Sequence, residues 1–125
     1  MKRITLFFLI YIQLISCINK SASKITIGQI HSIKSLNEIS LGENDTVFVV
    51  FGGGYNDCST PDHLEVIQKD FLITIKAYSK QPTKPEICLD NVPSQTLSYI
   101  FKPISKGTYT FKAFDSEIIS TTKVK

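Results

Sequence analysis

The chain has 125 residues, of which 42% are hydrophobic and 20% are charged, and its formal net charge is +3. Without Lys2 and Arg3, 12 basic residues face 11 acidic residues, so the rest of the chain carries a net charge of +1. A nearly neutral chain with dispersed lysines is not expected to bind nucleic acid. Its length allows one domain with a modest core.

The first residues have the pattern of a targeting segment. Lys2 and Arg3 precede an apolar run from Ile4 to Ile15, which is too short to span a bilayer and matches the apolar part of a signal peptide. A buried N-terminal helix or strand is the alternative. The adjacent positive charges and the abrupt loss of apolarity at Asn19 favour export.

The run ends in Leu14-Ile15-Ser16-Cys17, which resembles the bacterial lipobox. The resemblance implies that residues 1–16 are removed and that Cys17 carries the lipid, whose buried methylenes hold the protein on a membrane at about 0.8 kcal/mol each. Residues 17–23 then form a tether, and residues 24–125 form the domain. The alternative is ordinary cleavage after Ser21-Ala22-Ser23, which gives a secreted product.

Cys58 and Cys88 are the two cysteines that remain after either cleavage. Because an exported domain meets an oxidising compartment, we expect them to form a disulfide. Closing a loop of this size stabilises a domain by about 3–4 kcal/mol in the chain-entropy description.

Alternation of apolar and polar residues predicts about eight short strands and no long helix. The first strand is expected at a sheet edge. Apolar spacing over residues 30–39 also allows a helix, but the β-branched residues there favour extended chain. The expected strands cover residues 24–30, 36–40, 46–51, 63–67, 71–78, 95–104, 108–114 and 117–124.

The stretch from Thr46 to Cys58 is the most distinctive in the chain. Residues 47–51 are apolar on both faces, which predicts a central strand that is covered on both sides. Gly52-Gly53-Gly54 follows, and we expect a flexible turn there. A phosphate-binding loop would need a following helix, but Tyr55-Asn56-Asp57 and Pro61 follow instead.

Two irregular segments are expected to meet at the disulfide. Residues 79–86 contain Pro82 and Pro85 and are predicted to form a loop, because proline cannot donate to a ladder. The Cys58–Cys88 disulfide would hold this loop against residues 55–61. The candidate partner-binding loop therefore comprises Tyr55, Asn56, Asp57, Pro82 and Pro85.

Three features resemble the immunoglobulin-like domains of bacterial exported proteins and lipoproteins. They are the Leu41-Gly42-Glu43 turn before a Val-rich strand, the cysteine after that strand with a partner 30 residues on, and Gly107-Thr108-Tyr109. The last is similar to the tyrosine corner, in which a hydroxyl closes back on the backbone. The resemblance implies an all-β, immunoglobulin-like antiparallel β-sandwich of seven to eight strands with one disulfide. Phe111 occupies the antibody-type cysteine position, so this disulfide lies elsewhere.

Candidate chemistry is weak in this sequence. Asp57, Cys58, Asp62 and His63 are close together, but an oxidised cysteine does not ligate zinc. A nucleophilic cysteine paired with His31 or His63 is disfavoured for the same reason. We therefore expect no enzyme activity, no cofactor and no metal site.

The sequence thus predicts a monomeric lipoprotein of the cell envelope with a non-catalytic binding or structural module. It would contact the membrane through its N-terminal lipid and a protein partner of unknown identity. The alternative is a secreted inhibitor, for example of a protease, that acts through the disulfide-clamped loop at residues 79–88. A second candidate binding patch consists of four tyrosines, since tyrosine suits interfaces: Tyr55, Tyr78, Tyr99 and Tyr109.

Overall fold

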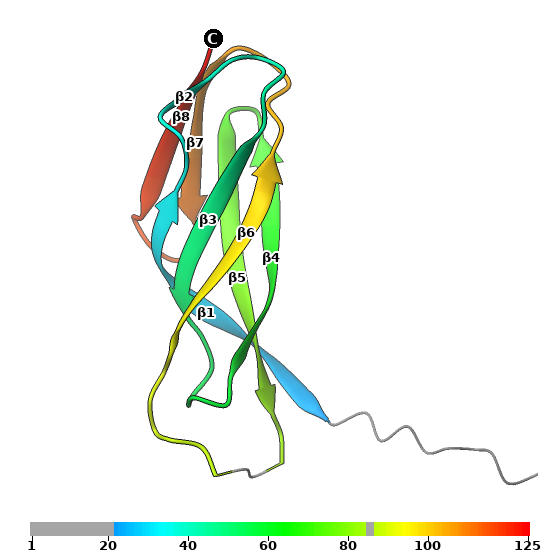
Figure 1. Ribbon diagram of the computed structural model, residues 1–125, viewed down its shortest axis with the longest axis vertical. Coiled ribbons are helices and arrows are strands. Elements are labelled where there is room, and N and C mark those ends of the chain that lie inside the picture. Colours follow the sequence, from blue (N-terminus) through cyan, green and yellow to red (C-terminus); the bar gives the residue numbers. More distant parts are fainter. Residues whose placement is uncertain (1–21, 85–86) are drawn as a thin grey trace, which may run out of the picture.

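The computed structural model describes residues 22–84 and 87–125 (Figure 1). These residues form eight strands and no helix, which confirms the all-β class and the number of strands. No helix of the described residues could therefore cross a membrane. The expected leader, the lipidation site Cys17 and Pro85 lie outside the described residues. The strands are β1 Ser23–Lys34, β2 Glu38–Ile39, β3 Asp45–Gly52, β4 Thr60–Lys69, β5 Leu72–Pro82, β6 Ser94–Phe101, β7 Gly107–Ala113 and β8 Ile119–Val124.

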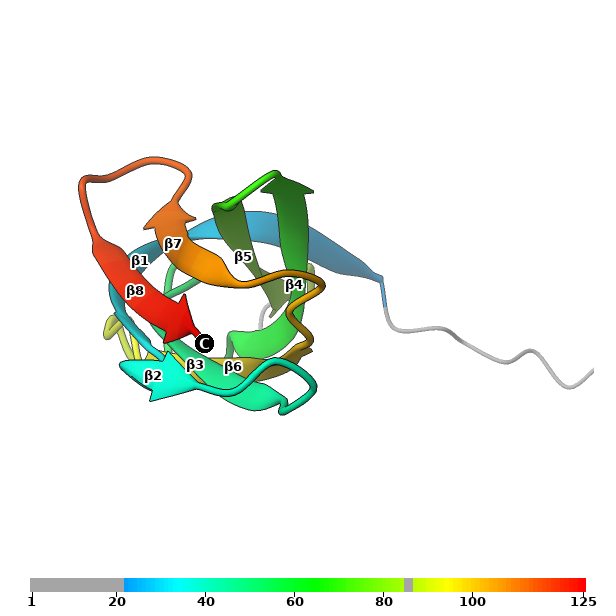
Figure 2. The same cartoon turned by 90° about the horizontal axis from the view of Figure 1, so that it is seen from above.

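The strands form one curled sheet. Its order is β2-β8-β7-β5-β1-β3-β6, and β4 pairs with β5 beside this path. Seen from above, the strands curve around a common centre as a half-barrel (Figure 2). The side chains that face this centre form the core.

Strand β1 joins the two parts of the sheet. Residues 23–28 pair with β5, and residues 29–34 pair with β3. A bulge lies between Ile30 and Ser32, which makes His31 the extra residue. β1 is therefore longer than the expected edge strand and has a different partner along each half.

Two strand pairings are parallel, so the expectation of a wholly antiparallel sheet is wrong. β7 runs parallel to β5, and β2 runs parallel to β8. The β5–β7 pairing follows from the connection at residues 102–106, which carries the chain from β6 across the end of the half-barrel to a place beside β5. A local sequence pattern does not specify such a crossing.

The core is richest in aromatic rings around Phe101. Its ring meets Tyr109 and Phe111 edge to face, with ring centroids 4.9 and 5.1 Å apart. The expected inward face of β7 is confirmed, because alternate residues of that strand are buried. The buried hydrophobic residues are Ile30, Ile33, Ile39, Val47, Val49, Phe51, Ile73, Ile75, Ala77, Phe101, Tyr109, Phe111, Ala113 and Val124.

Tyr109 closes the connection between β6 and β7. The Ser105 backbone N–H donates to the Tyr109 hydroxyl at 3.2 Å, and this hydroxyl donates to the Ser105 carbonyl at 3.1 Å. The predicted closure of a tyrosine hydroxyl on the preceding backbone is therefore present.

Two expectations about individual strands are corrected. β3 is covered on one face only: Val47, Val49 and Phe51 are buried, but Phe48 is 46% exposed because no second layer covers the outer face. Residues 79–82 belong to β5 rather than to a loop. Pro82 is tolerated there because it is the last residue of its strand.

Candidate functional site

The disulfide joins two loops at one end of the half-barrel. Cys58 lies between β3 and β4, Cys88 lies between β5 and β6, and their Cα atoms are 5.6 Å apart. The predicted pairing is confirmed. We call the loop residues 53–59, 83–84 and 87–93 the clamped end, which is the lower end in Figure 1.

Asn56 and Asp57 connect these loops by hydrogen bonds. Asn56 Oδ1 accepts a hydrogen bond from Gln81 Nε2 at 2.7 Å and another from the Cys58 N–H at 3.1 Å. Asp57 Oδ1 accepts from the Leu89 N–H at 2.7 Å, and the Asp57 N–H donates to the Leu89 carbonyl at 3.2 Å. Two of the expected partner-binding residues therefore have their polar atoms engaged in holding the clamped end together.

A buried polar network lies beneath the glycine turn. Gln95 Oε1 accepts from Ser79 Oγ at 2.7 Å, and Gln95 Nε2 donates to Ser59 Oγ at 3.1 Å. Ser59 Oγ in turn donates to the Gly53 carbonyl at 2.6 Å. Each polar group thus regains in the interior the hydrogen bonds it lost on leaving water.

The glycines of this turn are required by close packing. A Cβ atom on Gly53 would lie 1.6 Å from Ser79 Oγ, and a Cβ atom on Gly54 would lie 2.2 Å from Ser59 Cβ. Gly54 also has a φ of +80°. The expected flexible turn is thus a packed one. The alternation along β5 and β6, which places Ser79 and Gln95 inward, was the signal that could have revealed the network.

The other expected loop residues are dispersed. Tyr55 is exposed, and the Lys24 ammonium lies 5.8 Å from its ring centroid. Pro82 is half-buried at the end of β5. The structure therefore brings Tyr55 to the surface of the clamped end, with Asn56 half-buried and Asp57 exposed but hydrogen-bonded to Leu89.

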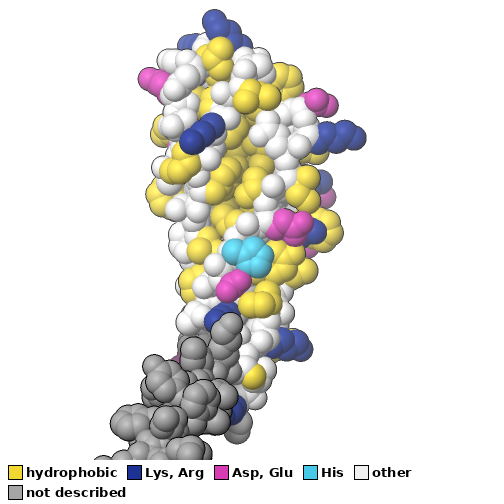
Figure 3. All heavy atoms as spheres, turned by 90° about the vertical axis from the view of Figure 1, so that its right-hand side faces the viewer, with side chains coloured by type: hydrophobic (Ala, Val, Ile, Leu, Met, Phe, Trp, Pro, Cys, Tyr) yellow, Lys and Arg dark blue, Asp and Glu magenta, His cyan; other side chains and the backbone are white. Residues whose placement is uncertain are grey.

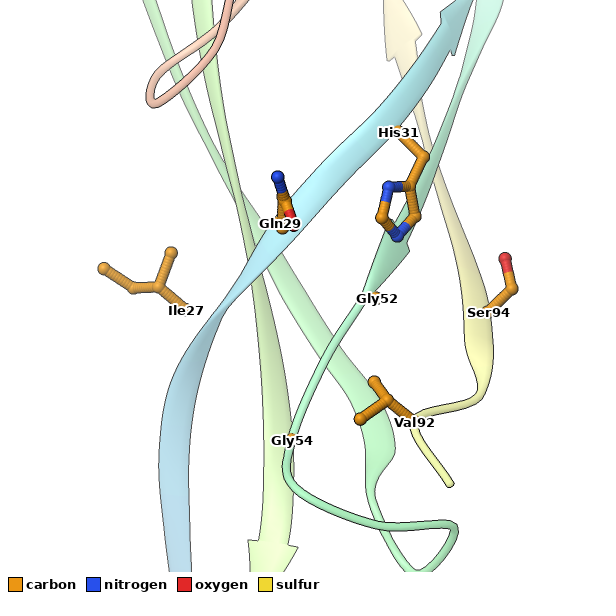
Figure 4. Close-up of a pocket in the computed structure, with 7 residues that line it drawn as sticks. All are labelled: Ile27, Gln29, His31, Gly52, Gly54, Val92 and Ser94. Atoms are coloured by element: carbon orange, nitrogen blue, oxygen red, sulfur yellow. The ribbon is translucent and has the colours of Figure 1, made fainter. Parts of the chain in front are cut away.

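A groove of about 480 Å³ opens beside the clamped end (Figure 4). Gln29, Gly52 and Ser94 lie in one row across β1, β3 and β6. The bulge adds His31, whose Nε2 lies 2.8 Å from where a Cβ of Gly52 would be. The groove is hollow because glycines form its floor. Its lining residues are Ile27, Gln29, His31, Gly52, Gly54, Val92 and Ser94.

The lining of the groove carries no acidic residue and no lysine. Its amide, imidazole and hydroxyl groups can donate or accept hydrogen bonds, and Ile27 and Val92 supply apolar contact. Such a lining suits a neutral polar group or a side chain of a partner protein. Sequence reasoning missed this groove because neither the bulge at His31 nor the row across three strands can be read from local patterns.

The candidate metal ligands do not form a thiolate site. Donor atoms of Asp57, Cys58 and Cys88 lie within 4.8 Å of one another, but both sulfurs belong to the disulfide. His63 lies on the outer face of β4, with Nδ1 2.5 Å from Asp62 Oδ2. Its ring stacks on Tyr78 at 4.5 Å between centroids. This side of the molecule shows a histidine beside acidic side chains and a band of hydrophobic ones (Figure 3).

Tyr78 also connects β5 to β4. Its hydroxyl donates to Glu65 Oε2 at 2.8 Å, and Lys76 Nζ lies 3.4 Å from the same oxygen. The hydrogen bond from Tyr78, followed by that from Lys76, lowers the pKa of the Glu65 carboxyl, and the same bond to Glu65 raises the pKa of Tyr78. These are cross-strand contacts on a sheet face, and they support the pairing of two strands.

The four tyrosines do not form one patch. Tyr55 and Tyr78 face outward at different places, and Tyr109 is buried. The hydroxyl of Tyr99 is buried, and within the described residues it has no hydrogen-bond partner. Burial, followed by the charge of Asp45, raises its pKa.

Comparison of the chain with protein-family models, with curated proteins and with solved structures gives no match.

Proposed function

We propose that this protein is an extracytoplasmic lipoprotein whose non-catalytic β domain binds a partner in the groove beside the clamped end. The observation that carries the proposal is the clamp: a disulfide and an internal hydrogen-bond network fix the two loops that border the groove. A fixed site loses little conformational entropy when it binds. The disulfide also fits an exported protein.

Within the all-β class, we propose more specifically an immunoglobulin-like sandwich. Strand β1 passes from one part of the sheet to the other through a bulge, as strands at the corners of sandwiches do. The hydroxyl of Tyr109 closes on Ser105, which is similar to a tyrosine corner. In this description the two parts of the curled sheet correspond to the two sheets of a sandwich.

A secreted inhibitor acting through residues 79–88 has weaker support. Residues 79–82 of that segment are paired in β5, so less chain is left to project into the cleft of an enzyme. The groove offers a concave surface instead, which fits a binding module better than an inhibitor.

The groove can be tested by comparing two substitutions on the same strand. Ser94→Arg places a long side chain in the groove, whereas Ser98→Arg places it on the same exposed face of β6, opposite Phe48 and outside the groove lining. Crosslinking on intact cells should capture a partner with the wild type and with Ser98→Arg but not with Ser94→Arg. Equal capture by both variants would contradict binding in the groove.

The same preparations test the anchor. Mass spectrometry of the mature N-terminal peptide should show an acylated Cys17. An unmodified terminus at Lys24 would contradict membrane anchoring and leave a secreted protein.

A further inference from the structure

The chain enters the domain at the clamped end. β1 begins at Ser23, which pairs with Pro82 at the end of β5. The backbone N–H and the Oγ1 of Thr83 donate to the Ala22 carbonyl at 3.1 and 2.7 Å. The start of the domain is therefore hydrogen-bonded to Thr83, the first residue of the second clamped loop. In Figure 1, β1 begins in the lower part of the molecule, towards the clamped end.

The length of chain before this point sets a short distance to an anchor at Cys17. Ala22 follows Cys17 by five residues. Fully extended, these five residues reach at most about 18 Å. A lipid on Cys17 would thus hold the clamped end close to the bilayer and the opposite end, with the loop at residues 102–106, away from it.

The side chains at the clamped end suit that position. Tyr55 is 63% exposed, Leu89 is 68% exposed and Ile87 is fully exposed. Asn56 Oδ1 and Asp57 Oδ1 accept hydrogen bonds within the clamp, and exposed Asp57 and Asp90 place carboxylates beside these apolar side chains. Lys24 beside the Tyr55 ring adds an ammonium on a long apolar stem, and both side-chain types are favoured at membrane interfaces.

We propose that the clamped end rests on the membrane that carries the anchor, with Tyr55, Ile87 and Leu89 in the headgroup region. This inference rests on the proposed lipidation of Cys17. Because the disulfide fixes the two loops relative to each other, both tips can touch the surface together. The groove then opens beside the bilayer, so its partner is a molecule at that membrane surface.

Tryptophan reporters can measure this orientation, since the chain contains no tryptophan. Tyr55→Trp and Leu89→Trp place the reporter on the two tips. Ile104→Trp is the matched control, because Ile104 is 83% exposed in the connection between β6 and β7 at the opposite end. The acylated mature variants, which begin at Cys17, are reconstituted in vesicles of phosphatidylethanolamine and phosphatidylglycerol with brominated acyl chains.

Both tip reporters should show blue-shifted emission and lose fluorescence to the bromines, and Ile104→Trp should show neither effect. An acylated protein whose tip reporters are quenched no more than Ile104→Trp would overturn the orientation and leave the proposed anchoring intact. An unacylated N-terminus would overturn both. Peptide mapping of the Cys58–Cys88 bond and an unchanged melting temperature show that each variant is folded.

Discussion

At the scale of single residues, the glycine turn shows how this sequence combines small residues with a polar interior. Gly53 is buried against Ser79, and its carbonyl accepts the hydroxyl of Ser59. A Cβ atom on the neighbouring Gly52 would lie 2.8 Å from Nε2 of His31, but the His31 side chain is exposed and can turn away. The two glycines are adjacent in sequence but differ in what a side chain would meet.

Gly53→Ala should therefore destabilise the domain by about 1–3 kcal/mol, as overpacking of a full interior does. Gly52→Ala is the control and should change stability little. Denaturant unfolding measures both. Ser79→Gly removes the two atoms that the new methyl group would meet, so the double variant should be more stable than the sum of the single effects. Strict additivity would show that Gly53 has no packing role.

At the scale of strands, β4 and β5 are held by paired side chains on their outer face. Glu65 lies opposite Lys76, and His63 lies opposite Tyr78. Because the folded state lowers the pKa of Glu65, the carboxylate stabilises the domain above the pKa it has in the unfolded chain. That contribution is lost as the pH falls through the lowered folded pKa. The pKa of Tyr78 is raised in the folded state, so its neutral phenol stabilises the domain below its unfolded pKa. This stabilisation is lost as the pH rises through the raised folded pKa.

The Tyr78→Phe variant separates these effects. Without the phenol, the carboxylate of Glu65 loses its main hydrogen bond, so we expect its pKa to rise towards the ordinary value for glutamate. Carboxyl carbon shifts in an NMR titration measure this. Tyr55→Phe is the control, because Tyr55 lies in the loop between β3 and β4 and has no contact with Glu65 that lowers its pKa, so the titration of Glu65 should stay unchanged. A Glu65 pKa that is equal in the wild type and Tyr78→Phe would refute the coupling.

Several elements could be predicted from sequence because their patterns are local. The alternation along β7 correctly placed Tyr109, Phe111 and Ala113 inward, and the cysteine pair followed from the expected compartment. The apolar stretch of β3 was misleading, because Phe48 faces outward although its neighbours are buried. Phe48 is exposed because no further layer packs on the outer face of the curled sheet, which the sequence of β3 alone does not reveal.

The candidate site was less predictable because distant residues create it. Along β1, Ile25 and Ile27 face outward and Gly28 faces inward. A Cβ atom on Gly28 would lie 2.5 Å from a ring carbon of Phe51, so the inward position has room only for glycine. The direction in which β1 faces therefore depends on a residue of another strand. The same holds for the groove, whose floor and walls come from β1, from β3 and the loop after it, and from the start of β6 and the chain before it.

At the scale of the whole molecule, one disulfide closes a loop of 30 residues. It links the segments on either side of β4 and β5, so it restricts a large part of the unfolded chain. Replacing both cysteines, as Cys58→Ser with Cys88→Ser, should lower the free energy of unfolding by about 3–4 kcal/mol. Unfolding of the variant and of the wild type in urea measures the loss. An unchanged midpoint would contradict a stabilising clamp.

The parallel pair of β2 and β8 affects when the molecule can fold. Glu38 and Ile39 find their partners at Lys123 and Val124, so the sheet stays incomplete until the last residues of the chain are available. Pairings between such distant segments slow folding, because a long loop must close before they form. During synthesis, the emerging chain therefore lacks the strand that pairs with both β2 and β7 until the end. If the protein is exported as proposed, this delay helps the chain to stay unfolded while it is threaded through a translocation channel.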